Sequence, residues 1–359
     1  MKKIIKAIGL CLGVIVLAAA AFILYLFVTD YRPQDEEEVV LEGSGSRAIA
    51  PGDALSVLTF NIGYGGLDAD TDFFMDGGSA VLATSKEKVE SNISGVGDIL
   101  TRENTDVVFL QEVDLDSKRS WNVNEAELLA GRLSGRSMAY GVNYRCRYIP
   151  YPWPMMGKVE GGLVTYNALA AENTAVRKAL PGSFSWPVSM CQLKRCLLVE
   201  RVPLEGTEQE LVLVNLHLEA YDSDGGGKKA QTKVLYELLQ REYEKGNYVI
   251  AGGDFNQTFD TVPEDLYPLK FTDHFMPGRI DTSVLGEGWT FANDVSAPTS
   301  RLLNEPYDPD SENTQYYMLD GFILSPNVTL TAVKTLDEGF AYTDHNPVRV
   351  DVVLDTQND

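Results

Sequence analysis

The stretch Tyr248-Val249-Ile250-Ala251-Gly252-Gly253-Asp254-Phe255-Asn256 leads an apolar run through two glycines into two polar residues. The apolar part is short, β-branched and aromatic, which favours a strand over a helix. Because successive side chains of an extended chain alternate in direction, Asp254 and Asn256 project from the same side. Asp and Asn after two glycines are also common in plain turns, so the segment needs support from the rest of the chain.

Comparable short apolar runs continue on both sides of this stretch. They occupy residues 55–60, 107–110, 162–166, 197–202, 211–216, 317–324 and 348–354. Two segments instead have helical spacing, with apolar stripes at Val89, Ile93, Val96, Ile99 and Leu100 and at Ala230, Val234, Leu235, Leu238 and Leu239. Strands with helices between them, and no second break in composition, predict one α/β domain over residues 53–355.

Polar residues interrupt or end several of these runs. Asn61 ends the first, Gln111-Glu112 the second, and His217 follows Asn215-Leu216; Asp320 follows Leu319, and Asp344-His345 follow Thr343. Each has a simpler explanation, since a Glu after a strand is usually exposed and a buried Asp is often a structural hydrogen-bond acceptor. Histidine is the sharper signal, because the chain has only 3 and two of them lie in these motifs.

Taken together, the motifs resemble those of the endonuclease/exonuclease/phosphatase superfamily, which includes nucleases similar to deoxyribonuclease I. The matching pieces, in the family's order, are Thr59-Phe60-Asn61, Leu110-Gln111-Glu112, Asn215-Leu216-His217-Leu218, Gly252-Gly253-Asp254-Phe255-Asn256, Leu319-Asp320 and Thr343-Asp344-His345-Asn346-Pro347. The resemblance implies a four-layer α/β sandwich, in which helices flank two packed β-sheets. It also implies hydrolysis of a phosphodiester or phosphomonoester by metal-assisted in-line attack of water.

The resemblance further implies roles for individual residues. Glu112 would be the main Mg²⁺ ligand, with Asn61 beside it and Asp344 supporting the metal or a histidine; Mn²⁺ is an alternative ion. Asp254 would align or deprotonate the attacking water, and Asn256 would hold a phosphate oxygen.

His217 and His345 would donate to the phosphoryl oxygens or transfer protons, and Asp320 would orient His345. Three positions depart from the family pattern without removing a catalytic group: Leu216 where Thr is common, Thr343 where Ser is usual, and Gly321 where an aromatic residue is frequent.

The N-terminus predicts a membrane anchor. Residues 7–28 contain no charged side chain, and this run is long enough to cross a bilayer as a helix. A cleaved signal peptide is the main alternative, but bulky residues follow the small Ala18 to Ala21. Three lysines precede the run, so we expect a cytoplasmic tail at 1–6 and a catalytic domain outside the cell membrane. The chain therefore resembles a membrane-anchored, bacterial-type member of the superfamily.

Residues 29–52 are rich in Pro, Asp, Glu, Gly and Ser, which predicts a flexible stalk. All 52 acidic residues follow the apolar run, against 30 Lys and Arg in the whole chain. Such an acidic surface repels polyanions, although it also serves solubility alone. Beyond Cys11 there are three cysteines, of which Cys191 and Cys196 are spaced for a short hairpin disulfide; three free thiols are the simpler alternative.

The substrate stays open at this point. The aromatic, proline-rich and basic segment 144–158 is either a substrate-facing loop or a loop packed on the core, and Arg301, within the long segment 271–313, either meets a phosphate or lies on the surface. A nuclease acting on extracellular DNA or RNA, a sphingomyelinase-like phospholipid phosphodiesterase, and a catalytically silent binding module are the alternatives. No protein partner is indicated.

Overall fold

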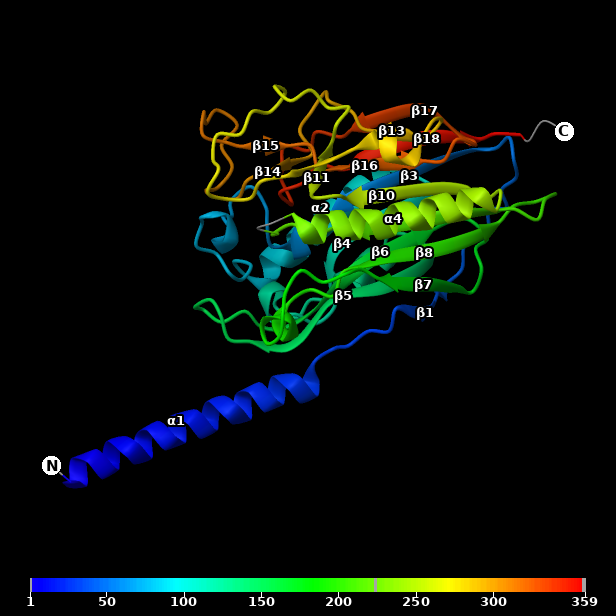
Figure 1. The fold of residues 1–359 in the computed structure, drawn as a ribbon. Helices are drawn as coiled ribbons and strands as arrows, with labels where there is room; N and C mark the ends of the chain where they lie inside the picture. Colours follow the sequence, from blue (N-terminus) through cyan, green and yellow to red (C-terminus); the bar gives the residue numbers. More distant parts are fainter. Residues whose placement is uncertain (1, 223–224, 357–359) are drawn as a thin grey trace.

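The computed structural model describes residues 2–222 and 225–356, in which two seven-stranded sheets pack face to face (Figure 1). The first sheet has the order β1 (Glu36–Val40), β7 (Thr174–Ala179), β8 (Cys196–Pro203), β9 (Glu210–His217), β10 (Tyr248–Asp254), β16 (Asp320–Leu324) and β13 (Thr290–Ala292). The second has the order β17 (Val328–Thr335), β18 (Val348–Leu354), β3 (Ala54–Asn61), β4 (Val107–Asp114), β6 (Gly157–Asn167), β5 (Ser137–Ile149) and β2 (Glu42–Gly43).

Helices cover the outer faces of both sheets. The stripe predicted around Val89 lies on α2 (Lys86–Glu103), which packs with α3 (Glu125–Ala130) against β3 and β4. The second predicted stripe lies on α4 (Gly226–Glu244), whose Leu235 and Leu239 are buried against the other sheet. Between the sheets lies a core that includes Val57, Phe109, Leu213 and Ile250. The four-layer α/β sandwich is therefore confirmed.

Smaller elements connect these layers. They are the strand pairs β11 (Gln257–Phe259) with β12 (Gly278–Ile280) and β14 (Ser300–Arg301) with β15 (Tyr316–Tyr317), and the 3-10 helices η1 (Gly63–Gly65), η2 (Phe74–Asp76), η3 (Lys118–Ser120), η4 (Val188–Cys191) and η5 (Thr282–Leu285).

The pairing directions bring distant motifs to one end of the sandwich. β3 runs parallel to β4 in one sheet, and β9 runs parallel to β10 in the other. The hydrogen bond between Asn61, at the end of β3, and Asp254, at the end of β10, shows that the carboxyl ends of both pairs meet. β16 is antiparallel to β10, which places its first residue, Asp320, opposite Asp254. The end where these strands meet holds the candidate active site.

At the N-terminus, α1 (Lys2–Thr29) is long and apolar enough to cross a membrane, a test that a signal sequence also passes. The predicted tail 1–6 begins with a residue outside the described part of the chain. The flexible stalk predicted for 29–52 is wrong for much of its length, because β1 pairs with β7 and β2 with β5. Ile49 in the same region is buried in the core between the sheets.

Ion pairs explain how so acidic a segment forms a strand. In the register of β1 and β7, Glu37 lies opposite Arg177 and Glu36 opposite Lys178. Lys178 Nζ is 3.3 Å from Glu36 Oε1, and Arg177 Nη1 is 3.8 Å from Glu37 Oε2. Opposite charges across a strand pair favour this pairing, and a count of residue types does not reveal them.

Candidate active site

Asp254, at the end of β10, is the centre of a buried polar cluster. Its Oδ2 is 3.4 Å from His217 Nε2 and 3.7 Å from His345 Nε2, and Asn61 Nδ2 donates to it over 3.1 Å. Its Oδ1 accepts the backbone N–H of Asn256 at 2.8 Å. Four of the six sequence motifs therefore converge on one carboxylate.

A glycine is needed immediately before Asp254. Gly253 has φ 153°, and a Cβ there would lie 1.9 Å from the carbonyl oxygen of Leu216. Parallel β9 thus approaches β10 closely enough to place His217 directly opposite Asp254 in the register. The glycines before Asp254, which in the sequence also suggested a turn, are therefore needed for close packing inside β10.

Glu112 is aimed by an irregularity in β4. The pairing of β4 with β6 shifts register between Leu110 and Val113, and Glu112 has φ 54°. Such a bulge bends a strand and redirects a side chain, and a left-handed backbone at a non-glycine residue is typical of functional sites. Glu112 Oε1 consequently accepts a hydrogen bond from Asn61 Nδ2 at 3.2 Å.

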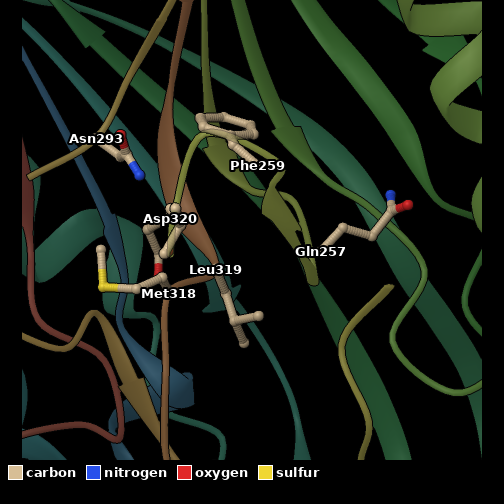
Figure 2. Close-up of a pocket in the computed structure, with 7 residues that line it drawn as sticks. Gln257, Phe259, Asn293, Met318, Leu319 and Asp320 are labelled. Carbon is tan, nitrogen blue, oxygen red and sulfur yellow. The ribbon is translucent and has the colours of Figure 1, made fainter. Parts of the chain in front are cut away.

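His345 and Asp320 form a closely hydrogen-bonded pair. His345 Nδ1 and Asp320 Oδ2 are 2.8 Å apart, which leaves His345 Nε2 facing Asp254. Asp320 Oδ1 has no hydrogen-bond partner among the described residues. Figure 2 shows residues that line a crevice beside Asp320; the full lining is Gln257, Phe259, Val262, Asn293, Met318 and Leu319. This crevice has no room for a water molecule. The side chain of Asp320 thus bonds to His345 and has no space beside it for a ligand.

Phe259 also explains one departure from the family pattern. A Cβ at Gly321 would lie 2.8 Å from the carbonyl oxygen of Ala292 and 3.0 Å from the Phe259 ring, so an aromatic side chain does not fit there. A second departure keeps its chemistry, because the hydroxyl Oγ1 of Thr343 lies 3.1 Å from both the Asn61 carbonyl oxygen and Asp344 Oδ1 and donates its one proton to this pair of acceptors.

The surroundings push the pKa values of the two histidines in opposite directions. Burial, then the positive Arg195, His345 and Arg119, hold the pKa of His217 well below its ordinary value. Burial also works against the charge of His345, but the carboxylates of Asp320, Asp344 and Asp254 outweigh it and raise the pKa of His345 well above the usual range. At neutral pH His217 is therefore neutral and His345 is an imidazolium.

Two further carboxylates that offer oxygen ligands to a divalent cation, Glu112 and Asp344, lie beside this cluster. Burial raises the pKa of Asp344 to about 6, and the nearby charge of Glu112 adds to that effect. Glu112, Asp344 and the amide of Asn61 thus form an oxygen-rich, electronegative group, which is the donor set that Mg²⁺ prefers. The ligand atoms of Asp254, Asp320 and His345 also lie within 4.8 Å of one another, but the His345–Asp320 hydrogen bond accounts for that closeness.

Three arginines lie beside the site, and only Arg301 was considered from the sequence as a possible phosphate contact. Arg119 binds Asp114 through two hydrogen bonds, stacks 3.9 Å from the Tyr64 ring centroid and lies 4.0 Å from Glu112 Oε2. Arg195 Nη1 donates to the carbonyl of His217, and Arg301 is buried, so the surface position considered for Arg301 is wrong. In the sequence, the two acidic residues two positions apart in β4, Glu112 and Asp114, were the available sign of a nearby cation such as Arg119.

These groups open into one large cavity of about 950 Å³. Its lining includes Glu112, His217, Asp254, Asn256, Asp344 and His345. The cavity also contains His274, which the sequence placed in an ordinary acidic segment, together with many apolar side chains. Every predicted site residue therefore lies in or directly behind one pocket, with Asn61 and Asp320 supporting it from behind.

A family model described as the endonuclease/exonuclease/phosphatase family matches residues 58–345. The chain belongs to this family. As a member, it is a phosphoesterase, a hydrolase acting on ester bonds, and enzymes of the endonuclease/exonuclease/phosphatase family generally depend on a divalent metal. No curated protein matches the chain.

Solved structures share the fold of this endonuclease/exonuclease/phosphatase chain at low identity. A family protein from Beutenbergia cavernae DSM 12333 is 18% identical with a TM-score of 0.57, over 84% of this chain and 72% of that one. One from Bacteroides thetaiotaomicron is 16% identical with a TM-score of 0.52, over 85% and 99%. One from Leptotrichia buccalis C-1013-b is 14% identical with a TM-score of 0.51, over 83% and 99%.

Proposed function

We propose that the chain hydrolyses a phosphodiester or phosphomonoester with Mg²⁺, or alternatively Mn²⁺, through in-line attack on phosphorus by a water molecule that Asp254 aligns and deprotonates. The observation that carries this proposal is that the Nε2 atoms of two histidines, His217 and His345, converge on one buried carboxylate oxygen, Asp254 Oδ2. A bound Mg²⁺, held by Glu112 with Asp344 and Asn61, would neutralise charge on the phosphoryl oxygens.

The protein's own residues supply the remaining steps. Asp254 Oδ2 orients a water and accepts its proton, a role that suits a pKa raised by burial to about 6. His345, held protonated by Asp320 at its other ring nitrogen, donates from Nε2 to a phosphoryl or leaving-group oxygen. His217 enters as a neutral imidazole that donates a hydrogen bond, and Asn256 holds a further phosphoryl oxygen.

A nuclease reading has one specific observation against it. Arg147 in the segment 144–158 is exposed, but three other basic residues in and beside that segment are each paired with an acid: Arg145 with Glu160, Lys158 with Asp116, and Lys194 with Asp30. Because a polyanion is attracted by unneutralised cations, these residues add little to nucleic-acid affinity. A catalytically silent module is disfavoured by the hydrogen bonds that hold His345, Asp254 and Asn61 in place.

We further propose that α1 anchors the chain in the cell membrane, with the N-terminus cytoplasmic and the catalytic domain outside. The support is the apolar helix and the three lysines before it. Protease added to intact cells should then remove the domain. A domain that resists the protease in intact cells but not in opened ones would show the opposite orientation.

Full-length protein in detergent micelles, assayed with bis-p-nitrophenyl phosphate and p-nitrophenyl phosphate, tests the chemistry. We expect turnover with Mg²⁺, loss with EDTA, and a decrease of about 10²-fold or more in kcat for Glu112→Gln. Glu90→Gln, at an exposed position on α2, is the matched control and should keep wild-type turnover. Turnover that survives both EDTA and Glu112→Gln would exclude the proposed metal role.

A further inference from the structure

The mouth of the cavity carries exposed aromatic side chains. We name as the aromatic rim five aromatic residues and one valine from the end of β5, the segment between β5 and β6, and the segment between β7 and β8: Tyr148, Tyr151, Trp153, Phe184, Trp186 and Val188. Trp153 is 82% exposed and Trp186 63% exposed. Tyr151, Phe184 and Val188 also line the cavity. The rim is therefore continuous with the active site, and it is a larger apolar patch than isolated exposed residues would make.

The membrane helix leaves the domain beside this rim. Phe22 of α1 packs edge-on against Tyr148, with ring centroids 6.1 Å apart, and Leu26 is buried against the domain. Just after the helix, Tyr31 lies under Arg145 at 5.0 Å, and Asp30 Oδ1 is 3.5 Å from Lys194 Nζ. Figure 1 shows α1 running beneath the end of β5. The exit of the helix is thus fixed to the catalytic domain.

This fixed exit sets the depth of the rim. The uncharged run 7–28 spans about 33 Å as a helix, close to the ~30 Å hydrocarbon core. Phe22 lies about 9 Å inside the outer end of that run, at a rise of ~1.5 Å per residue. Its partner Tyr148 therefore reaches the outer edge of the hydrocarbon core, next to the boundary layer where Trp and Tyr are favoured.

The cavity behind the rim suits an apolar chain. Away from the catalytic groups its walls include Phe73, Phe74, Tyr221, Phe275 and Met276. Apolar walls stabilise a hydrocarbon chain by about 25 cal/mol per Å² of buried surface. The charged side chains in this part of the cavity are held by neighbours, since Asp76 accepts a hydrogen bond from Tyr221 and Lys228 lies over the Phe275 ring. One opening therefore joins a membrane-facing rim, an apolar chamber and a set of phosphoryl-binding groups.

We propose that the aromatic rim lies in the boundary layer of the membrane that α1 crosses, and that the cavity takes a phosphoester lipid directly from that membrane. One acyl chain of the lipid lies against the apolar walls, and the phosphoryl group meets Asp254 and His345. In the reaction the water oxygen bonds to phosphorus, and a P–O ester bond breaks with its electron pair on the ester oxygen, which takes a proton. This inference rests on the proposed phosphoester hydrolysis and names its substrate class.

The position of the rim is tested by quenching of tryptophan fluorescence. Full-length protein is reconstituted in nanodiscs of phosphatidylcholine and phosphatidylglycerol with brominated acyl chains. The chain has 4 tryptophans, and we expect quenching to fall by about half or more in Trp153→Phe/Trp186→Phe. Trp289, which packs on Tyr243 of α4, provides the control, because Trp289→Phe should leave the quenching unchanged. Equal quenching in both variants would overturn the proposed position of the rim.

The substrate class is tested by turnover in nanodiscs. The discs contain equal parts of phosphatidylcholine, phosphatidylethanolamine, phosphatidylglycerol, phosphatidic acid and sphingomyelin, and bis-p-nitrophenyl phosphate is assayed beside them. We expect lipid turnover with Mg²⁺, and a ratio of lipid to soluble-ester turnover at least about tenfold lower in Trp153→Ser/Trp186→Ser. Val284→Ser/Val295→Ser, at exposed apolar positions near β13, should keep the wild-type ratio.

The outcomes separate the two proposals. If the soluble ester is hydrolysed and no lipid is, the lipid inference fails and the proposed hydrolysis stands. If plasmid DNA or RNA is hydrolysed and lipid is not, the inference is also overturned, in favour of a nuclease. If none of these substrates is hydrolysed, the proposed function itself fails. An unchanged ratio in the rim variant, despite lipid turnover, would remove the rim from substrate capture.

Discussion

When they are ionised, the buried carboxylates of Asp254 and Asp344 lower the free energy of unfolding. Burial raises the pKa of each from 3.8 to about 6. A carboxyl whose pKa is higher in the folded state stabilises the fold most below its unfolded pKa, and this contribution disappears as pH rises through the folded value. The free energy of unfolding of the metal-free protein should therefore fall between about pH 4 and pH 6 from these two groups.

Asp344→Asn tests that cost. In EDTA near neutral pH, we expect the variant to unfold with a free energy about 1–3 kcal/mol higher than wild type, because it no longer holds a buried charge. Activity should be lost, since the neighbour of Glu112 at the metal is gone. Urea denaturation measures the difference, and Asp265→Asn, at an exposed position, should change neither property. A less stable Asp344→Asn protein would show that Asp344 is a structural acceptor instead.

Asp320→Asn tests the protonation of His345. Burial alone would lower the pKa of His345, and the three carboxylates around it reverse that effect. Because His345 acts as a donor, activity should fall as pH rises through its raised pKa. Removing the Asp320 charge lowers that pKa, so the alkaline limb of the kcat profile should move to lower pH, with kcat reduced by about 10²–10⁴. An alkaline limb that stays in place would assign it to another group.

At the scale of elements, the central strands were predictable because both sheet faces are covered. Every residue of β10 is buried, which produces the continuous apolar run seen in the sequence. The edge strands β1 and β2 were not predictable, because each is held by residues far along the chain: β1 by cross-strand ion pairs with β7, and β2 by backbone pairing with β5. Local composition in that segment resembles a linker.

The site residues were predictable from their places at strand ends, whereas the features that orient and hold them were not. Asn61, His217 and Asp254 end strands, and the sequence records such positions directly. The aim of Glu112 depends on a bulge set by the pairing with β6, and Arg119 acts through Asp114 and the Tyr64 ring. These are properties of the folded pairing, so a single sequence carries little trace of them.

The cysteines give a prediction about β5 and η4. The structure has no disulfide among its four cysteines, and Cys191 hydrogen-bonds to Cys146, not to Cys196. The Cys191 hydrogen bond lowers the pKa of Cys146 to about 7, whereas burial raises the pKa of Cys196 to about 11. The hairpin disulfide considered for Cys191 and Cys196 is therefore replaced by a predicted Cys146–Cys191 pair.

Diamide, which takes two electrons and two protons from a pair of thiols, provides the test. Peptide mapping after treatment should find Cys146 joined to Cys191, because the thiolate form is most available at Cys146. Cys196→Ser should leave the crosslink, and Cys146→Ser should abolish it. A crosslink between Cys191 and Cys196 would contradict the arrangement of β5 and η4.

At the scale of the whole molecule, the segment between the membrane and the sandwich is a structural part of the enzyme. Tyr31 hydrogen-bonds to Glu37 at 2.8 Å and contacts Arg145, while β1 and β2 extend the two sheets. Val39 and Leu41 pack against a buried cluster that contains Ala175 and Leu198. A flexible stalk would let the domain rotate freely, whereas these contacts hold the aromatic rim in one orientation beside α1.

Two truncated proteins distinguish a stalk from a structural segment. Residues 30–359 keep β1, β2 and Tyr31, so thermal unfolding of this protein should match that of the full chain. Residues 44–359 lose both edge strands and leave Arg177, which is almost fully buried, without Glu37. We expect a loss of about 2–5 kcal/mol in the free energy of unfolding, from the missing strand hydrogen bonds and from exposure of the apolar surface under Val39 and Leu41. Differential scanning fluorimetry of both proteins in one buffer compares their unfolding midpoints. Identical midpoints would show that residues 30–43 are a flexible stalk, and the depth of the aromatic rim would then not be fixed.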